Sequence, residues 1–237
     1  MDKRNLSLDI FLGEKAEVKK PPERKEAQRL HKLPKGWKWV RLKSLLSKKP
    51  QYGLTAKSTK EGRILYLRIT DIDLSGKLVL TEPRYVDVNE ETFKKYSIKV
   101  GDILIARSGA TAGKAFLCEE NMKAVFASYL IRFKVDERKI LPKYLFYFLH
   151  SNEYWNQVKS WKVGGAQPNV NAQNLKKLFV PLAPIEEQKR IVSRIEELMP
   201  KIEELRRLRK SAMEEAEKIM QTALYKVFDR AEERGWD

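Results

Sequence analysis

Hydrophobic and polar residues alternate with a period of two in several short runs between residues 33 and 183, a pattern typical of β-strands. In ILYLRITDID, residues 64–73, Ile64 and Tyr66 fall on one face and Leu65 on the other, and LSGK then turns the chain. We expect one strand through this whole segment. Further strands are predicted within residues 33–42, 100–109, 123–136 and 175–182.

A helical pattern interrupts these strands. Residues 140–160, ILPKYLFYFLHSNEYWNQVKS, predict a helix that begins near Pro142 and directs Tyr144 and Phe148 inward. Strands followed by a helix and a further strand predict an α/β, or mixed α+β, domain over residues 33–183.

A second helical pattern runs through residues 184–230 and has heptad spacing. Apolar residues recur in alternating steps of four and three, with Arg209 at the polar position of the stripe. A stripe of about six heptads is longer than a domain of this size would cover, so we expect a coiled coil between chains rather than a helix packed along its own domain. Pro200 should kink or break the helix, because proline lacks a backbone N–H. The predicted dimerisation residues are Ile191, Ile195, Leu198, Ile202, Leu205, Ala212, Ala216, Ile219 and Ala223.

The remaining segments are polar. Residues 1–32 contain KKPPERKE, in which two prolines interrupt regular structure, and we interpret them as a leader or arm. The sequence therefore divides into this leader, a globular domain (33–183), a spacer and dimerisation helix (184–230) and a tail (231–237).

Charge is distributed unevenly over these parts. The chain has 48 Lys and Arg against 32 Asp and Glu, a net charge of +16. Residues 184–237 hold 12 basic and 13 acidic residues, so residues 1–183 carry a net charge of +17. A strongly basic globular part favours a polyanionic partner such as nucleic acid, although a solvated basic surface would have the same composition.

Other sequence features exclude several classes of protein. Cys118 is the single cysteine, and with His31 and His150 as the two histidines the sequence predicts neither a disulfide framework nor a metal site. Apolar runs are too short for a membrane span of about 20 residues, and no secretory signal is evident. We expect a cytoplasmic protein.

The segment ILIARSGATAGKA, residues 103–115, invites comparison with a phosphate-binding P-loop. Gly109 and Gly113 are separated by three residues where the P-loop has four, and Ala115 stands where a hydroxyl would hold Mg²⁺. Neither a methyltransferase motif nor a dinucleotide-binding motif occurs, and the acidic cluster at residues 136–139 favours a solvated loop. The sequence therefore contains no motif that indicates catalysis.

Side chains that contact DNA bases and phosphates are nevertheless plentiful. Arginine can bridge guanine, asparagine and glutamine can bridge adenine, and lysine, serine and threonine hold phosphates. For the asparagines and glycines, a structural role in turns explains the residues equally well. The candidate DNA-binding residues are Lys57, Arg63, Arg68, Arg107, Ser108, Thr111, Lys114, Arg132, Lys162, Gln167, Asn169 and Asn171.

Three motifs in this order carry a resemblance to a known family. LPKGWKWVRL, GDILIARSGATAGKA and GGAQPNVNAQNLKKLFVPLAPIEEQKRIV together resemble the specificity subunit of type I restriction-modification systems, and the resemblance covers residues 33–228. It implies a target recognition domain followed by a conserved spacer helix. It also implies a non-catalytic subunit that binds double-stranded DNA and brings methyltransferase subunits, and often restriction subunits, to a bipartite target. S-adenosylmethionine, ATP and Mg²⁺ would be bound by those partner subunits.

The sequence departs from the family in length, because typical members have two recognition domains and two spacer helices. A second copy packed antiparallel along the heptad stripe would restore the two-domain arrangement, so we expect a homodimer. Two alternatives remain at this point. In the first, the chain is a coiled-coil protein that binds nucleic acid without sequence preference. In the second, it is the product of a silent half-gene that serves in recombination.

Overall fold

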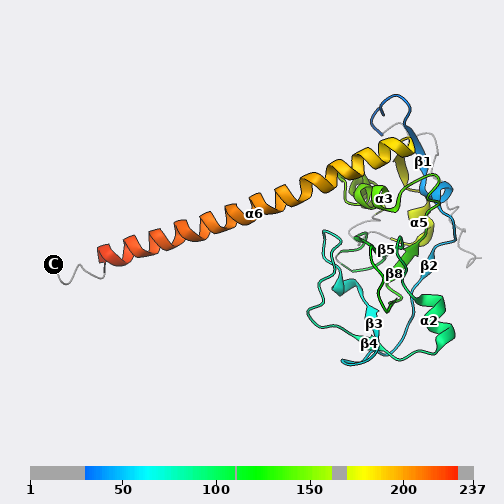
Figure 1. Ribbon diagram of the computed structural model, residues 1–237, viewed down its shortest axis with the longest axis horizontal. Helices are drawn as coiled ribbons and strands as arrows, with labels where there is room; N and C mark the ends of the chain where they lie inside the picture. Colours follow the sequence, from blue (N-terminus) through cyan, green and yellow to red (C-terminus); the bar gives the residue numbers. More distant parts are fainter. Residues whose placement is uncertain (1–29, 110, 162–169, 229–237) are drawn as a thin grey trace, which may run out of the picture. The chain divides into compact units, whose positions relative to one another are not determined.

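The computed structural model describes residues 30–109, 111–161 and 170–228. The chain divides into two units, Met1–Pro34 and Lys35–Asp237, and all elements below belong to the second unit. Figure 1 shows short strands and helices followed by the long helix α6.

The central sheet has four antiparallel strands in the order β2-β8-β5-β6. Ile103 of β5 pairs with Phe133 of β8 on one side and with Leu117 of β6 on the other. The strands are β2 (Gln51–Tyr52), β8 (Leu130–Phe133), β5 (Ile103–Ala106) and β6 (Ala115–Leu117).

Both faces of this sheet are covered, which explains the continuous apolar run in β5. Ile103 and Ile105 belong to the larger hydrophobic cluster, whereas Leu104 and Ala106 belong to a second cluster on the opposite face. Because successive side chains point to opposite faces of a strand, a strand buried on both faces needs apolar residues at every position.

Two smaller sheets complete the β structure. One has the order β4-β3-β7, with β3 antiparallel to β4 and parallel to β7. The other pairs β1 with β9 in antiparallel fashion, so the two ends of the globular domain lie side by side. These strands are β4 (Tyr85–Val86), β3 (Ile64–Leu67), β7 (Ala124–Phe126), β1 (Lys38–Arg41) and β9 (Phe179–Leu182).

Short helices connect the strands. Asn89 caps the first turn of α2 by accepting the Thr92 N–H, and Ser151 caps α4 in the same way from Tyr154. The helices are η1 (Leu42–Leu45), η2 (Ile69–Asp71), α2 (Glu90–Tyr96), α3 (Pro142–Phe148), α4 (Asn152–Lys159) and α5 (Ala172–Lys176).

The last element, α6 (Ile185–Phe228), begins beside α3. Gln188 in its first turn is fully buried and binds three backbone groups, accepting the Leu141 N–H and donating to the carbonyls of Lys139 and Ala183. Val192 is buried, whereas the residues from 196 to 228 are exposed.

Two expectations about these elements were wrong, and of the kink or break expected at Pro200 the break is excluded. The strand predicted over residues 64–73 ends at Leu67, because the Arg68 N–H and guanidinium bind Asp71 and start η2. The helix predicted from Pro142 through residue 160 is two helices, since Ser151 caps a new one. Pro200 does not break α6, which runs as one helix through it.

Candidate nucleic-acid interface

The glycine-rich segment is the loop of a β-hairpin. It joins the antiparallel strands β5 and β6, and the Gly113 N–H donates to the Ala106 carbonyl at 2.8 Å. A P-loop instead joins a strand to a helix, so the structure agrees with the sequence in excluding one here. Gly113 has φ +102°, and a Cβ there would lie 3.0 Å from the Trp155 ring, so glycine is needed for both conformation and space.

Arg107, at the start of this loop, is exposed and stacks on an aromatic residue. Its guanidinium carbon lies 5.0 Å from the centre of the Tyr52 ring, and the backbone N–H of Arg107 donates to the Tyr129 carbonyl at 2.9 Å. Tyr129 is 59% exposed and Tyr52 is 40% exposed. The Tyr52 hydroxyl accepts the Ala172 N–H at 3.2 Å, which links β2 to α5. These contacts hold a cationic fork against an aromatic ring at the surface, and the exposed Tyr129 lies nearby.

A basic hollow of about 520 Å³ lies beside Tyr52. Sequence reasoning missed the lysines of this hollow, although the run SKKP before β2 was a signal, because a short charge run is usually just solvated. Besides Tyr52, its polar side chains come from four lysines, a glutamine and a serine: Lys43, Lys48, Lys49, Lys176, Gln173 and Ser47.

Lys57 and Arg63 are exposed, but Arg63 lies by a different hollow. That hollow also contains Glu61 and Asp87, whose carboxylates make it unsuited to phosphate. The structure therefore does not bring Arg63 together with Arg107.

Arg68 is committed to an internal ion pair. Its Nη2 and Nε donate to the two carboxylate oxygens of Asp71 at 2.6 and 3.1 Å, and Nη2 also donates to the Glu82 carbonyl. The hydrogen bonds that the guanidinium donates to Asp71 raise the pKa of Arg68. This fork-to-fork pairing leaves the side chain 28% exposed and fixes the turn after β3.

Lys114 does not fit its predicted role. The side chain is buried, its ammonium group donates to the Ile72 carbonyl, and burial lowers the pKa of the amine. A lysine with its head inside the domain ties the hairpin loop to the segment after η2, so we remove it from the DNA-binding candidates.

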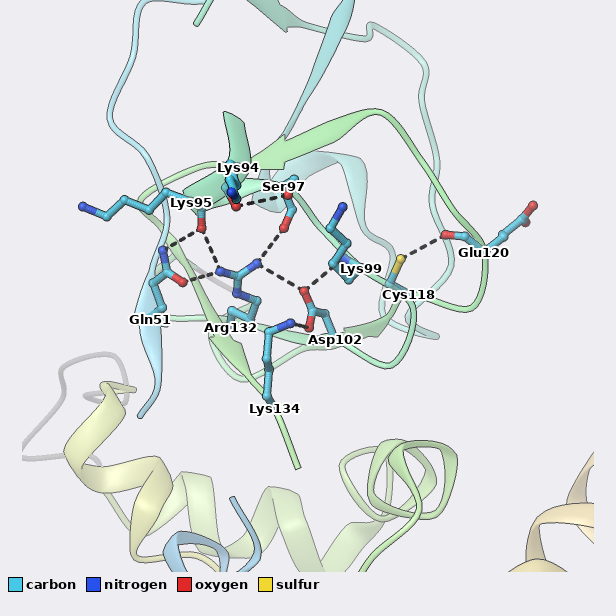
Figure 2. A network of polar contacts seen from close by, with 10 residues as sticks. All are labelled: Gln51, Lys94, Lys95, Ser97, Lys99, Asp102, Cys118, Glu120, Arg132 and Lys134. Carbon is cyan, nitrogen blue, oxygen red and sulfur yellow. Dashed lines mark hydrogen bonds and ion pairs between the residues drawn. The ribbon is translucent and has the colours of Figure 1, made fainter. Parts of the chain in front are cut away.

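Arg132 does not fit its predicted role either, because it is buried at the end of α2 (Figure 2). Nη1 donates to the Ser97 carbonyl at 2.6 Å and to Asp102 Oδ2 at 3.2 Å. Nη2 donates to the Lys95 carbonyl at 3.0 Å and to the side-chain oxygen of Gln51. The guanidinium satisfies carbonyls at the C-terminal end of a helix, a structural role in place of base reading.

The remaining polar candidates are divided. Ser108 and Thr111 are half-buried in the hairpin loop. Asn171 caps α5, its side-chain oxygen accepting the N–H groups of Gln173 and Asn174, which is the structural alternative that the sequence left open. Lys162, Gln167 and Asn169 lie outside the described residues.

The heptad stripe of α6 changes from buried to exposed along the helix. Ile191 packs against the larger hydrophobic cluster, and Ile195 is half-buried. Leu205 and Ile219 are 65% and 71% exposed. The rest of the predicted dimerisation residues are exposed as well, namely Leu198, Ile202, Ala212, Ala216 and Ala223.

Within the described ranges, no group of three or more His, Cys, Asp or Glu side chains is placed to hold a metal ion. No helix in the same ranges is long and apolar enough to cross a membrane.

The comparisons with known proteins agree with the motifs. The family described as "Type I restriction modification DNA specificity domain" matches residues 34–211. A putative type I restriction enzyme MjaX specificity subunit of Methanocaldococcus jannaschii is 34% identical over 166 residues, which cover 67% of this chain and 38% of that protein. The EcoBI specificity subunit of Escherichia coli is 27% identical over 203 residues, 83% of this chain and 42% of the other.

Solved structures give the same result. The crystal structure of the HsdS subunit from Thermoanaerobacter tengcongensis superimposes with a TM-score of 0.60 and 28% identity, over 83% of this chain and 50% of that chain. The chain thus spans half the length of this subunit, and less than half that of the two curated relatives. These relatives are named as specificity subunits and not as catalytic subunits, in agreement with the non-catalytic role predicted from the sequence. The mixed α/β domain, its long C-terminal helix and the family match together show that the chain belongs to the type I restriction-modification DNA specificity family.

Proposed function

We propose that this chain is the sequence-specific DNA-recognition subunit of a type I restriction-modification enzyme, and that it binds a bipartite target as a homodimer. The observation that carries the DNA-binding part is the exposed Arg107 stacked on Tyr52 beside a lysine-lined hollow, in a chain of a DNA specificity family.

These residues divide the work of recognition. An arginine fork held by an aromatic ring is suited to bridge O6 and N7 of a guanine in the major groove, because its geometry is fixed before DNA arrives. The lysines of the hollow beside Tyr52 are suited to phosphates, where a point charge on a flexible stem suffices. Base reading and backbone positioning would thus come from neighbouring parts of one surface.

The exposed stripe of α6 supports a homodimer. Large apolar side chains such as Leu205 and Ile219 are more than half exposed, and ion pairs within the helix, such as Arg207 with Glu204, flank the stripe. A second copy, packed antiparallel, would cover the stripe and place one recognition domain at each end. A symmetric dimer would then read a palindromic bipartite target, with a gap set by helix length.

Catalysis would come from partners. The methyltransferase subunit would bind S-adenosylmethionine and the restriction subunit, where present, would bind ATP and Mg²⁺, so this chain needs no cofactor of its own. The assembly would act on DNA in the cytoplasm.

A methylation map tests the proposal. Genomic DNA is sequenced from cells that express this chain with its methyltransferase subunit and from cells that lack the chain. We expect a modified palindromic bipartite motif that requires the chain. An asymmetric motif would indicate that the chain pairs with a different specificity chain and does not form a homodimer. Absence of any motif would favour a binder without sequence preference, or a silent half-gene.

A further inference from the structure

We propose that a second hollow, at the C-terminal end of α2, binds a phosphate group of the DNA backbone and so fixes the recognition domain on the duplex. This inference rests on the proposed function, because it takes double-stranded DNA as the source of the phosphate. The hollow has a volume of about 310 Å³ and lies over the network drawn in Figure 2.

The lining of this hollow is cationic. Besides Arg132, Gln51 and Ser97, it consists of six lysines, and no described carboxylate lines it. The lysines come from the loop before β2, from α2 and the segment after it, and from the residue after β8: Lys48, Lys49, Lys94, Lys95, Lys99 and Lys134. Segments far apart in sequence thus converge on one positively charged concavity, and such concavities concentrate anions.

The hydrogen-bond network beneath the lysines neutralises the partial negative charge that would repel an anion from this hollow. The C-terminal end of a helix carries that charge on its free carbonyls. Here Arg132 donates to the carbonyls of Lys95 and Ser97, and Gln51 Nε2 also donates to the Lys95 carbonyl at 3.2 Å. The negative end of α2 is therefore neutralised inside the protein.

Asp102 neutralises only part of the positive charge around the hollow. Its carboxylate is 2% exposed and binds Arg132 on one oxygen and the Lys134 ammonium at 2.7 Å on the other. Among the described residues, none of the other five lysines pairs with a carboxylate. Most of the charge around the hollow is thus available to an external anion.

Phosphate fits this hollow better than a base edge does. The one planar fork in the lining, that of Arg132, is buried and used internally. What remains are lysine ammonium groups, which hold phosphate oxygens without selecting a base.

Position in the fold favours the DNA backbone as the source. Lys48 and Lys49 line both this hollow and the one beside Tyr52, where Arg107 stacks. A backbone that passes the Arg107 loop therefore has a continuous cationic path into the second hollow.

The test compares two triple variants of the full chain with equal charge change. Lys94→Gln, Lys95→Gln and Lys99→Gln remove three lysines from the hollow, while Lys60→Gln, Lys123→Gln and Lys159→Gln remove three exposed lysines elsewhere. Affinity for target and for random duplex is measured against salt concentration with the methyltransferase subunit present. We expect the first variant to lower the slope of log K against log salt by about 1 to 2, since each lost phosphate contact contributes roughly 0.9.

The control variant should keep the wild-type slope, as should Lys94→Arg, Lys95→Arg and Lys99→Arg, which preserve the charges. The ratio of target to random affinity should be unchanged, because a phosphate contact acts on all sequences alike. Lys99→Gln alone, whose side chain takes no part in the network, gives the same test with a smaller slope change if the triple variant does not fold.

Equal slopes for the hollow variant and the control would overturn the inference. A changed target preference would also overturn it, since the lysines would then read bases. Failure of the proposed function looks different, because the wild type would bind random and target DNA equally while the slope comparison still tests the hollow.

Discussion

The guanidinium carbon of Arg107 lies 5.0 Å from the centre of the Tyr52 ring. Tyr52 lies in β2 and Arg107 directly follows β5, and both of these strands pair with β8. The pair joins the glycine-rich hairpin to the segment that carries Lys48 and Lys49. The sequence did not predict this contact, because 55 residues separate Tyr52 from Arg107 along the chain.

Arg107→Ala should reduce affinity for the target by roughly 1 to 3 kcal/mol and relax the preference at one base position of each half-site. The physical reason is the loss of two parallel hydrogen bonds to one base. Binding to randomised duplexes, followed by sequencing, measures both effects. Arg138→Ala is the control, because Arg138 is 89% exposed, pairs with Asp136 and lines neither of the two lysine-rich hollows. Unchanged preference in Arg107→Ala would remove the hairpin loop from base recognition.

Tyr52→Leu should weaken target binding less than Arg107→Ala, by about 0.5 to 1 kcal/mol, because it removes the ring that orients the guanidinium and leaves the guanidinium itself in place. In the Arg107→Ala background the same substitution should have almost no effect. A double-mutant cycle of target affinities measures this coupling. Additive losses would mean that Tyr52 contacts DNA independently of Arg107.

Gln188→Ala should lower the free energy of unfolding by roughly 2 to 4 kcal/mol, since it removes a fully buried side chain and the hydrogen bonds that it makes with the backbone of Leu141, Lys139 and Ala183. Chemical denaturation followed by circular dichroism measures the change. Gln221→Ala, on the exposed part of α6, should change stability by less than about 0.5 kcal/mol. Similar values for the two variants would show that Gln188 does not anchor the helix to the domain.

Asp102→Asn should destabilise the domain by roughly 3 to 5 kcal/mol, because the buried Arg132 would lose its counter-charge. Asp87→Asn, an exposed change of the same kind, is the control. Thermal unfolding of both variants at low and high salt gives the comparison. A loss in Asp102→Asn no larger than in the control would mean that the Lys95 and Ser97 carbonyls and the Gln51 side chain hold Arg132 without the carboxylate.

The sequence predicted the fold where the pattern reflects burial directly. The unbroken apolar residues of β5 indicated a strand, and the heptad spacing indicated α6. It failed where one side chain decides the outcome, as when Arg68 folds back on Asp71 and ends β3.

The candidate site shows the same limit. Lys114 follows two glycines in a polar loop and looked exposed, but tertiary contacts bury its head against the Ile72 carbonyl. The burial of Arg132 was easier to predict, because the residue lies in a strand between Ile131 and Phe133, which are both apolar and buried. The lysines of the two hollows come from separate segments, so no local pattern predicts that they converge.

Leu205→Glu should convert a dimer into a monomer. Leu205 lies near the middle of α6 and is 65% exposed, so in an antiparallel dimer it would lie close to its own copy across the two-fold axis. Glutamate there would place two like charges together in an apolar seam, at a cost that the remaining contacts would not offset. Gln221→Glu adds the same charge on the opposite face of the helix and should leave the dimer intact.

Light scattering after size-exclusion chromatography distinguishes these outcomes, since the chain has a mass of 27.7 kDa and the dimer twice that. We expect the dimer for the wild type and Gln221→Glu, and the single-chain mass for Leu205→Glu. A wild-type chain that stays monomeric at micromolar concentration, even with the methyltransferase subunit present, would contradict the symmetric dimer. The stripe of α6 would then be covered by a different chain.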